Sequence, residues 1–481
     1  MAPGSLASYR RKRDPDGTPE PIPKDDPSPR TGTKRPTFVI HEHHASSLHW
    51  DLRLERDGVL ASWAVPKGLP VSPDQNHLAV HVEDHPLEYA TFRGTIPAGE
   101  YGAGEVSIWD QGTYDCEKWR PGEVMVVLHG QRVDGRYVLF STKGDNWMIH
   151  RMDPAPEGYQ PLPAAASPML AVADRLPPDD GEWAFEFKWD GIRVLVWVDG
   201  GRLRMVSRNN NDITRSFPEL REFGASLGSR QALFDGELVV LGADGRPSFS
   251  RLQHRFAASP SAAKRLAGVH PASLVIFDLL HVDGISLFGD DYDHRRAALE
   301  ALDIGAPRWA VIPSFTDVPG EEILRVAGDA GLEGVVAKRR TSLYRPGKRS
   351  GDWIKVKIQR MQEVVIGGYT TGNGSRRADF GALLLGVPST GRKLTFVGKV
   401  GTGFSEGARG ELLAVLKRLD RATSPFDGAL PAGLAGDTAW VSPTLVGEVR
   451  YSEWTADGLL RHPVWRGLRP DKSRGDVRRE P

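Results

Sequence analysis

The chain has 481 residues, of which 40% are hydrophobic and 26% are charged, as in a water-soluble globular protein of roughly three domains. It contains no apolar run near the ~18 residues of a membrane span, and its N-terminus lacks the apolar core of a secretory signal. The single cysteine, Cys116, excludes an internal disulfide and cysteine-rich zinc fingers, so we expect a cytoplasmic protein. The 62 basic and 62 acidic residues cancel, so net charge does not indicate a nucleic-acid partner.

Residues 1–36 are rich in proline, glycine and charge, with eight basic and five acidic residues. This composition predicts a flexible N-terminal arm. The stretch KRDPDGTPEP, from Lys12 to Pro21, is the part we expect to dock onto the next domain.

Strands and glycine turns dominate residues 37–152, which predicts a small β-barrel domain. In HWDLRLE the strand period of two places one polar set on a wet face (His49, Asp51, Arg53, Glu55) and one apolar set toward a core (Trp50, Leu52, Leu54). Seven of the 14 histidines lie within residues 41–85.

A second polar cluster follows in HVEDHPLEYA, which contains His81, Glu83, Asp84, His85 and Tyr89. Imidazole with carboxylate suits manganese, zinc or iron, and a neighbouring arginine suits a phosphate. The alternative is a set of surface and half-buried histidines with ordinary hydrogen bonds. The glycine-rich GEYGAGEV lacks the Lys-Ser/Thr of a P-loop and is predicted to be a turn.

A Pro/Ala-rich linker is predicted at residues 153–167, followed by an α+β domain with antiparallel sheets at 168–359 and helices near 293–302 and 320–331. The stretch EFKWDGIR, Glu186 to Arg193, reads as a strand pair broken at Gly191. Lys188 is predicted at a strand end beside aromatic residues. Burial there would disfavour its charged form, and a neutral amine is a nucleophile, so this lysine is suited to covalent catalysis. The alternative is a snorkelling surface lysine.

Further polar residues interrupt the apolar strands of this domain. Glu237 and Glu333 could hold a divalent ion, and Phe277 could stack on a base. Lysines could neutralise a polyphosphate. Together these features predict nucleotidyl transfer onto a lysine, and the set is Lys188, Asp190, Arg193, Arg208, Asp235, Glu237, Phe277, Asp278, Glu333, Lys355 and Lys357.

Short strands with glycine turns return after residue 359, with a helix predicted near 406–419. A five-stranded OB-fold β-barrel at 360–475 is the expected fold, with a tail at 476–481. Residues 461–481 carry seven basic and three acidic residues.

In order and spacing, the motifs of residues 168–472 resemble those of ATP-dependent DNA ligases, in which K-x-D-G-x-R carries the adenylated lysine. They are KWDGIR, SRNN, FDGEL, FDLL, EGVVAKR, WIKVK and RHPVWRGLRPDK. The resemblance implies a multidomain protein with an α+β, ATP-grasp-like adenylation domain. It implies Lys188 and Asp190 as catalytic residues and Mg²⁺ or Mn²⁺ at Glu237 and Glu333. The implied ATP-binding residues are Glu186, Lys188, Arg193, Arg208, Glu237, Phe277, Lys355, Lys357, Arg469 and Lys472.

The segment HASSLHWDLRLERDGVLASWAVPKG is similar to the 3′-phosphoesterase module of bacterial ligase D. By that likeness His43, His49 and Asp51 are Mn²⁺ ligands, and His85 is catalytic. Phosphate-binding positions are Arg13, Arg53, Lys67, His77 and Tyr89, with Asp14 and Glu20 at other functional positions. Two residues depart from the pattern: His44 stands where aspartate is common, and His77 where an arginine is expected.

The two resemblances imply a two-module enzyme, too short for a polymerase module, that trims 3′-phosphate or 3′-ribonucleotide ends and seals them. Double-strand-break repair by non-homologous end joining is implied, with broken or nicked double-stranded DNA and the end-binding protein Ku as partners. We expect a monomer without membrane contact. The alternatives are an RNA-capping guanylyltransferase, a non-catalytic DNA-binding scaffold, or a ligase whose inactive phosphoesterase module only binds DNA.

Overall fold

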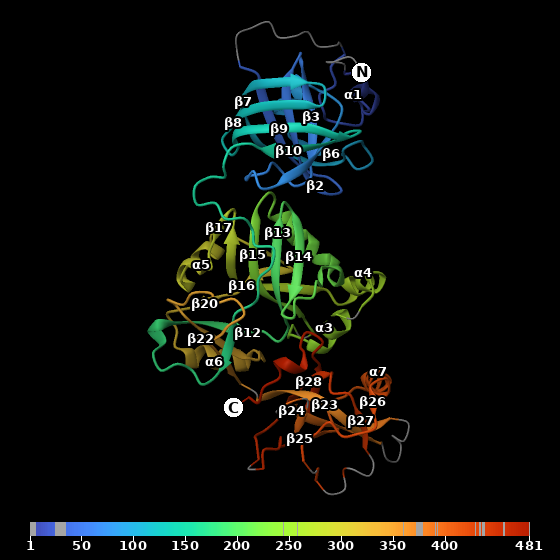
Figure 1. The fold of residues 1–481 in the computed structure, drawn as a ribbon, viewed down its shortest axis with the longest axis vertical. Helices are drawn as coiled ribbons and strands as arrows, with labels where there is room; N and C mark the ends of the chain where they lie inside the picture. Colours follow the sequence, from blue (N-terminus) through green and yellow to red (C-terminus); the bar gives the residue numbers. More distant parts are fainter. Residues whose placement is uncertain are drawn as a thin grey trace.

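Three bodies follow one another along the long axis of the molecule: a β-barrel, a middle domain of two sheets and a second barrel (Figure 1). The computed structural model describes residues 6–24 and 35–480, except 244, 257, 359, 372–378, 390, 392, 429, 432–433, 435–437 and 456. Within these ranges no helix is long and apolar enough to cross a membrane.

The first body is a closed antiparallel barrel in which the sheet runs β1-β2-β3-β4-β10-β9-β8-β7 and β7 pairs back onto β1. The two short strands β5 and β6 pair with β3 and β7. The strands are β1 (Thr37–His44), β2 (Leu48–Arg56), β3 (Val59–Val65), β4 (Asn76–His81), β5 (His85–Pro86), β6 (Gly94–Ile96), β7 (Gly104–Arg120), β8 (Glu123–His129), β9 (Asp134–Lys143) and β10 (Asn146–Arg151).

The inward face of the barrel is apolar, as the strand period predicted. Trp50, Leu52 and Leu54 are buried in its core. Asp51 and Arg53 alternate with them and point outward, yet they are only 5% and 3% exposed. The expectation of a wet face is therefore wrong for these two side chains, because other elements cover this part of the barrel wall.

The cover consists of residues 6–24, with α1 (Ala7–Arg11), and the 3₁₀-helix η1 (Leu87–Thr91). Leu6 and Tyr9 are buried against Leu60 and Tyr89 of the barrel. The expected flexible arm is thus wrong for residues 6–24, and the packed part extends beyond the stretch Lys12 to Pro21. Residues 1–5 and 25–34 lie outside the described residues.

The middle domain contains two sheets, as the α+β prediction required. One runs β11-β22-β21-β12-β20 and the other β14-β13-β15-β16-β19-β18, with β17 on β16. All pairings are antiparallel except β11–β22 and β16–β19. The strands are β11 (Leu170–Ala173), β12 (Trp183–Lys188), β13 (Ile192–Asp199), β14 (Arg202–Ser207), β15 (Gln231–Val240), β16 (Ala272–Val282), β17 (Ile285–Ser286), β18 (Gly305–Ala306), β19 (Trp309–Val311), β20 (Ser314–Phe315), β21 (Gly334–Arg339) and β22 (Arg349–Lys357).

Helices pack around these sheets, and the two that were predicted occur as α5 (Tyr292–Glu300) and α6 (Gly320–Asp329). The others are η2 (Asp180–Glu182), η3 (Thr214–Ser216), η4 (Pro218–Leu220), α2 (Arg221–Ser226), α3 (Phe249–Phe256) and α4 (Pro260–Val269). The predicted linker runs along this domain, where the Trp197 indole donates a hydrogen bond to the Pro163 carbonyl at 2.7 Å.

The third body has seven strands in its sheet within the described residues, where five were expected. They are β23 (Met361–Thr371), β24 (Phe380–Pro388), β25 (Leu394–Val400), β26 (Asp420–Arg421), β27 (Thr438–Val441), β28 (Val446–Arg450) and β29 (Val464–Leu468). The predicted helix is α7 (Glu406–Lys417), and η6 (Arg474–Asp476) follows the last strand. The expected tail is not free, because Val477 is buried in the core of this domain.

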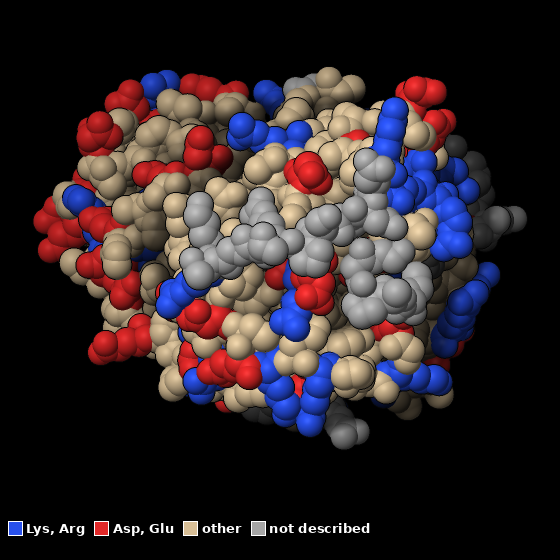
Figure 2. Space-filling view, turned by 90° about the horizontal axis from the view of Figure 1, so that it is seen from above, with Lys and Arg blue, Asp and Glu red and all other residues tan. Residues whose placement is uncertain are grey.

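The zero net charge conceals an uneven distribution of charge over the surface. Viewed end-on from the first barrel, acidic side chains gather toward the left of the view, and basic ones are more frequent toward the right and along the lower rim (Figure 2). Local basic surfaces therefore exist despite the overall balance.

Candidate active sites

A group that could hold a metal ion, called here the metal triad, consists of His43, His49 and Asp51 on the outer wall of the first barrel. The register of β1 on β2 places His43 opposite His49, and the ligand atoms of all three residues lie within 4.8 Å of one another. The Asp51 carboxylate is 3.7 Å from His43 Nδ1 and 3.6 Å from His49 Nε2. The strand period thus brings together the three ligands that the sequence predicted.

In each histidine of the triad, the ring nitrogen that does not face Asp51 donates a hydrogen bond to a backbone carbonyl. His43 Nε2 donates to Gly102 O at 2.9 Å, and His49 Nδ1 donates to Ser47 O at 3.0 Å. The remaining nitrogens therefore carry lone pairs and face the Asp51 carboxylate, which is the arrangement that metal-binding histidines require. This donor set fits a divalent cation such as manganese or zinc.

Arg53 lies directly beside the triad. Its Nη2 donates to Asp51 at 2.9 Å, its Nε donates to His41 Nδ1 at 3.3 Å, and its guanidinium lies 4.8 Å from the Tyr89 ring centre. Burial alone would raise the pKa of Asp51, but the Arg53 charge holds it below its usual range. The buried Arg53 Nη1 has no hydrogen-bond partner among the described residues, so a donor remains for an anion.

The segment 6–24 brings further charge to this wall. Arg13 donates to Glu20 at 2.9 Å and to Glu83 at 3.0 Å, and its Nη2 lies 3.2 Å from His85 Nε2. Burial, together with the charges of Arg53 and Arg13, holds the pKa of His85 well below its usual range. His85 is therefore neutral at neutral pH, with Nδ1 bonded to the Glu83 carbonyl at 2.8 Å.

Two of the predicted phosphate-binding residues lie elsewhere. Lys67 and His77 line a cavity between the first barrel and the middle domain, which no triad residue lines. His77 Nδ1 is 2.7 Å from Gly68 O, and burial lowers its pKa, so a protonated phosphate-binding role is not supported. His44, the other departure from the family pattern, lies 2.8 Å from the Glu42 carboxylate.

Lys188 lies where the chain crosses between the two sheets of the middle domain. It ends β12 of one sheet, and β13 of the other begins at Ile192, so the expected strand pair consists of neighbours in sequence that do not pair with each other. A Cβ on Gly191 would lie 2.2 Å from the Leu238 carbonyl. Only glycine allows this close approach, which explains the residue type at this point of the motif.

The Lys188 amine donates a hydrogen bond to Glu333, and Lys357 Nζ lies 3.5 Å from the other Glu333 oxygen. Burial would raise the pKa of Glu333, but the two lysines lower it to about 2. Glu333 is therefore an anion between two cationic side chains.

A cavity of ≈ 520 Å³, the Lys188 pocket, opens around this lysine. This size suits a nucleotide. Burial raises the pKa of Glu237 to about 7, and burial with the nearby Glu333 charge raises that of Asp190 to about 6. All the predicted ATP-binding and ligase metal positions line it: Glu186, Lys188, Arg193, Arg208, Glu237, Phe277, Glu333, Lys355, Lys357, Arg469 and Lys472.

One wall of the Lys188 pocket is held together by hydrogen bonds and an ion pair among its polar side chains. Arg193 is held by two hydrogen bonds to Asp235, at 2.8 and 2.6 Å, and lies 5.0 Å from the Phe277 ring centre. Glu186 is 2% exposed and accepts from Lys338 at 2.8 Å and from Tyr292 at 2.6 Å. The sequence did not assign roles to Lys338 and Tyr292; Lys338 lies within EGVVAKR, whereas Tyr292 had no local signal.

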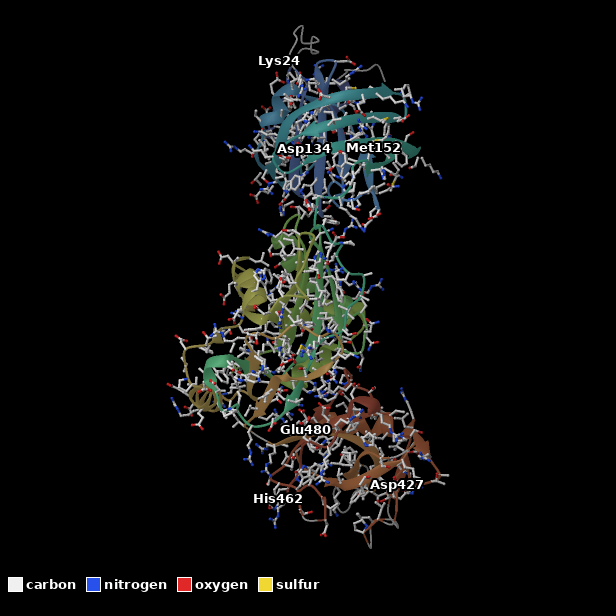
Figure 3. All side chains as sticks on the ribbon, turned by 60° about the vertical axis from the view of Figure 1, so that its left-hand side comes forward. Lys24, Asp134, Met152, Asp427, His462 and Glu480 are labelled. Atoms are coloured by element: carbon white, nitrogen blue, oxygen red, sulfur yellow. The ribbon has the colours of Figure 1, made fainter. Side chains whose placement is uncertain are left out.

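The third body closes the pocket with ion pairs that the sequence did not predict. Arg466 lies 3.5 Å from Asp190, Asp476 lies 3.5 Å from Arg208, and Glu480 lies 2.8 Å from Lys355 Nζ. Glu480 is at the boundary between the middle domain and the second barrel (Figure 3). The predicted Arg469 and Lys472 bond to carboxylates of their own domain, Asp471 and Glu363.

Three protein families match successive parts of the chain. Residues 41–141 match the DNA ligase D 3′-phosphoesterase domain, residues 163–357 the ATP-dependent DNA ligase domain, and residues 376–472 the ATP-dependent DNA ligase C-terminal region. The metal triad lies within the first match, and Lys188 lies within the second.

Similar proteins extend these matches over almost the whole chain. The "Multifunctional non-homologous end joining DNA repair protein LigD" of Mycobacterium tuberculosis is 47% identical over 99% of this chain, and the Pseudomonas aeruginosa "Multifunctional non-homologous end joining protein LigD" is 38% identical over 98%. The chain spans 61% of the length of each. A solved structure titled "mycobacterial DNA ligase D complexed with ATP and MES" is 41% identical, with a TM-score of 0.51, over 66% of this chain and 98% of that one.

Proposed function

Because the chain belongs to the ligase D family of ATP-dependent DNA ligases and carries the family's 3′-phosphoesterase domain, we propose that it trims and then seals DNA ends. The observation that carries the sealing activity is Lys188 at the crossing of two sheets, inside a pocket lined by lysines and carboxylates. The trimming activity is proposed from the metal triad with Arg53 beside it.

In the proposed sealing reaction Lys188 gives up a proton, proposed to pass to the Asp190 carboxylate of the same pocket, and its amine attacks the α-phosphorus of ATP. An N–P bond forms, the bond to the β-phosphate oxygen breaks, and pyrophosphate leaves. Glu333, which already accepts a hydrogen bond from Lys188, is placed to orient the amine. Lys355 and Lys357 are placed to neutralise the phosphoryl oxygens as charge develops. AMP then passes to the 5′-phosphate of the break, and the 3′-hydroxyl displaces it.

The Lys188 pocket suits a divalent cation as well as the nucleotide. Glu237 and Glu333 would hold Mg²⁺ or Mn²⁺, which as a Lewis acid polarises a phosphoryl oxygen. Asp190 is proposed to assist at the amine. Phe277 offers a ring for the base, and Glu186 is fixed by Lys338 and Tyr292 on the same wall.

At the other site, His43, His49 and Asp51 would hold Mn²⁺, which would polarise the phosphate of a 3′-phosphate or 3′-ribonucleotide end. Arg53 has a donor left for a phosphate oxygen. The neutral His85, next to Arg13, is proposed as the catalytic proton carrier. Tyr89 and Arg13 complete the proposed phosphate-binding set.

The setting proposed for both activities is repair of double-strand breaks by non-homologous end joining in the cytoplasm, with broken or nicked double-stranded DNA as substrate and Ku as partner. The names of the mycobacterial and Pseudomonas relatives support this setting. A monomer is proposed, because each predicted site is complete within one chain.

The test of the sealing proposal is incubation with α-labelled ATP and magnesium, followed by a denaturing gel. A labelled protein band is expected, and Lys188→Ala and Lys188→Arg should both lose it. Pretreatment with pyrophosphate removes any AMP already attached. If the pretreated protein still takes no label, the ligase proposal fails; a label from GTP instead of ATP would indicate a guanylyltransferase.

A further inference from the structure

The loop between β6 and β7 carries an unusual aromatic residue. Tyr101 is 46% exposed, and every other large hydrophobic side chain with comparable exposure among the described residues is aliphatic. A single exposed tyrosine is ordinary in itself. What distinguishes Tyr101 is its place at the edge of the metal triad.

The backbone of this loop is bonded to the triad. Gly102, which follows Tyr101, accepts the hydrogen bond from His43 Nε2 at 2.9 Å and has a φ of 79°. That conformation favours glycine. A Cβ on Gly102 would lie 3.9 Å from a ring carbon of His43. The exposed ring therefore belongs to the residue next to Gly102, whose carbonyl accepts a hydrogen bond from the proposed metal ligand His43.

Two cationic side chains from the segment 6–24 contact the Tyr101 ring. Lys12 Nζ donates to the Tyr101 hydroxyl at 3.0 Å and lies 4.5 Å from the ring centre, and the Arg13 guanidinium lies 5.5 Å from it. Lys12 also pairs with Glu83 at 2.8 Å. The ring is thus positioned by contacts with two basic side chains, while the residue stays 46% exposed.

We propose that Tyr101 is a stacking platform for the base of the nucleotide that carries the 3′-phosphate. Aromatic rings bind bases of nucleic acids by stacking, with little preference for sequence, and a neighbouring lysine attracts the phosphate backbone. A phosphate at the metal triad would bring the nucleotide that carries it toward Tyr101, because Gly102, the next residue, is hydrogen-bonded to His43. This inference rests on the proposed phosphoesterase function and adds a positioning residue for its substrate.

The test uses the full chain with Mn²⁺, without ATP, and measures phosphate release from strands with a 3′-phosphate. Tyr101→Ala should raise KM about tenfold with kcat unchanged, as expected for one lost stacked base. Tyr101→Phe should behave as the wild type. On a strand whose terminal nucleotide is abasic, wild type and Tyr101→Ala should have equal KM. An abasic penultimate nucleotide should leave the tenfold difference intact.

Equal KM values of wild type and Tyr101→Ala on the normal strand would overturn the proposal. So would an equal loss on normal and abasic strands, because the ring would then act through His43. Loss of the difference only with the penultimate abasic strand would overturn the assignment to the terminal base.

Strand binding in the presence of a chelator separates this inference from the phosphoesterase function. Comparing normal and abasic termini in wild type and Tyr101→Ala forms a double-mutant cycle, in which binding by the ligase domains cancels. If the wild type releases no phosphate but the cycle shows coupling, the phosphoesterase proposal fails and Tyr101 stacking stands. If the cycle shows no coupling, stacking fails whatever the activity.

Discussion

The metal triad lies on a single hairpin between His43 and Asp51, whereas the Lys188 pocket gathers side chains from Pro168 to Glu480 and from two domains. In the first, strand register alone sets the distances between the ligands. In the second, the distances depend on how the second barrel is seated on the middle domain. The same chain therefore holds one site fixed by local geometry and another completed by a second domain.

The largest expected effect is the separate loss of each activity when one residue of its site is substituted. Lys188→Ala should abolish AMP labelling and sealing while leaving 3′-phosphate release intact, because the nucleophile is lost. His43→Ala should abolish phosphate release, because a metal ligand is lost, and should leave AMP labelling intact. Both assays on both variants check this, and loss of both activities from either substitution would show that the sites are not independent.

The next largest expected effect is a loss of stability when residues 6–24, which cover the wall that carries the metal triad, lose a buried ion pair. Arg13→Ala leaves Glu20 and Glu83 buried without that partner, which costs about 3–5 kcal/mol for a broken buried pair. Thermal unfolding of the first barrel should shift accordingly, with phosphate release impaired and AMP labelling retained. Arg11→Ala, at an exposed position of the same segment, is the matched control and should stay near wild type. Equal stability of the two variants would contradict the packing described for residues 6–24.

The Lys188 pocket should respond to pH through Lys355. Burial, with Lys357 nearby, lowers the pKa of Lys355 to about 8. Below that pH the lysine is charged and binds phosphate, and above it the charge is lost. The Kd for ATP of Lys188→Ala, which cannot be adenylated, should rise above pH 8, approaching about tenfold per pH unit. With Lys355→Arg in that background, the Kd for ATP should not change above pH 8. A rise in Kd that persists with arginine would assign the pH effect to another group.

The smallest expected effect is a change in ATP affinity when Glu480 is substituted. Its carboxylate pairs with Lys355, and Gln362 holds the Glu480 backbone N–H at 2.9 Å. ATP phosphates must compete with this carboxylate, so Glu480→Gln at pH 7 should lower the Kd for ATP about three- to fivefold, as for a modest ion pair. Glu453→Gln, an exposed carboxylate of the same domain, is the control. A weaker affinity in Glu480→Gln would mean that Glu480 supports the nucleotide site instead.

The sequence predicts most of the triad because period and register are local properties. Trp50, Leu52 and Leu54 identify the inner face of the barrel and place His49 and Asp51 on the other face, whereas His43, His49 and Asp51 were assigned as ligands from the family resemblance. Sequence could not show that residues 6–24 cover this wall, because Leu6 and Tyr9 carry the signal in a segment whose composition resembles a disordered arm. Tertiary burial overrode composition there.

Motif order similarly predicts the members of the Lys188 pocket, but not their partners. The pairs Glu480–Lys355 and Asp476–Arg208 join positions more than a hundred residues apart. In each pair the acidic residue follows the last recognised motif. No periodicity connects such residues. For Lys67 and His77, a motif position gives the residue type but not the cavity that the side chain faces, and both line a cavity that no triad residue lines.

The most direct test of two separable sites in one chain is sealing of a nick that carries a 3′-phosphate and a 5′-phosphate, with ATP, Mg²⁺ and Mn²⁺. The wild type should seal it, and neither Lys188→Ala nor His43→Ala should do so alone. A mixture of the two variants should restore sealing, because one supplies the 3′-hydroxyl and the other joins it. Sealing by His43→Ala alone, or failure of the mixture while each variant retains its own activity, would contradict the account.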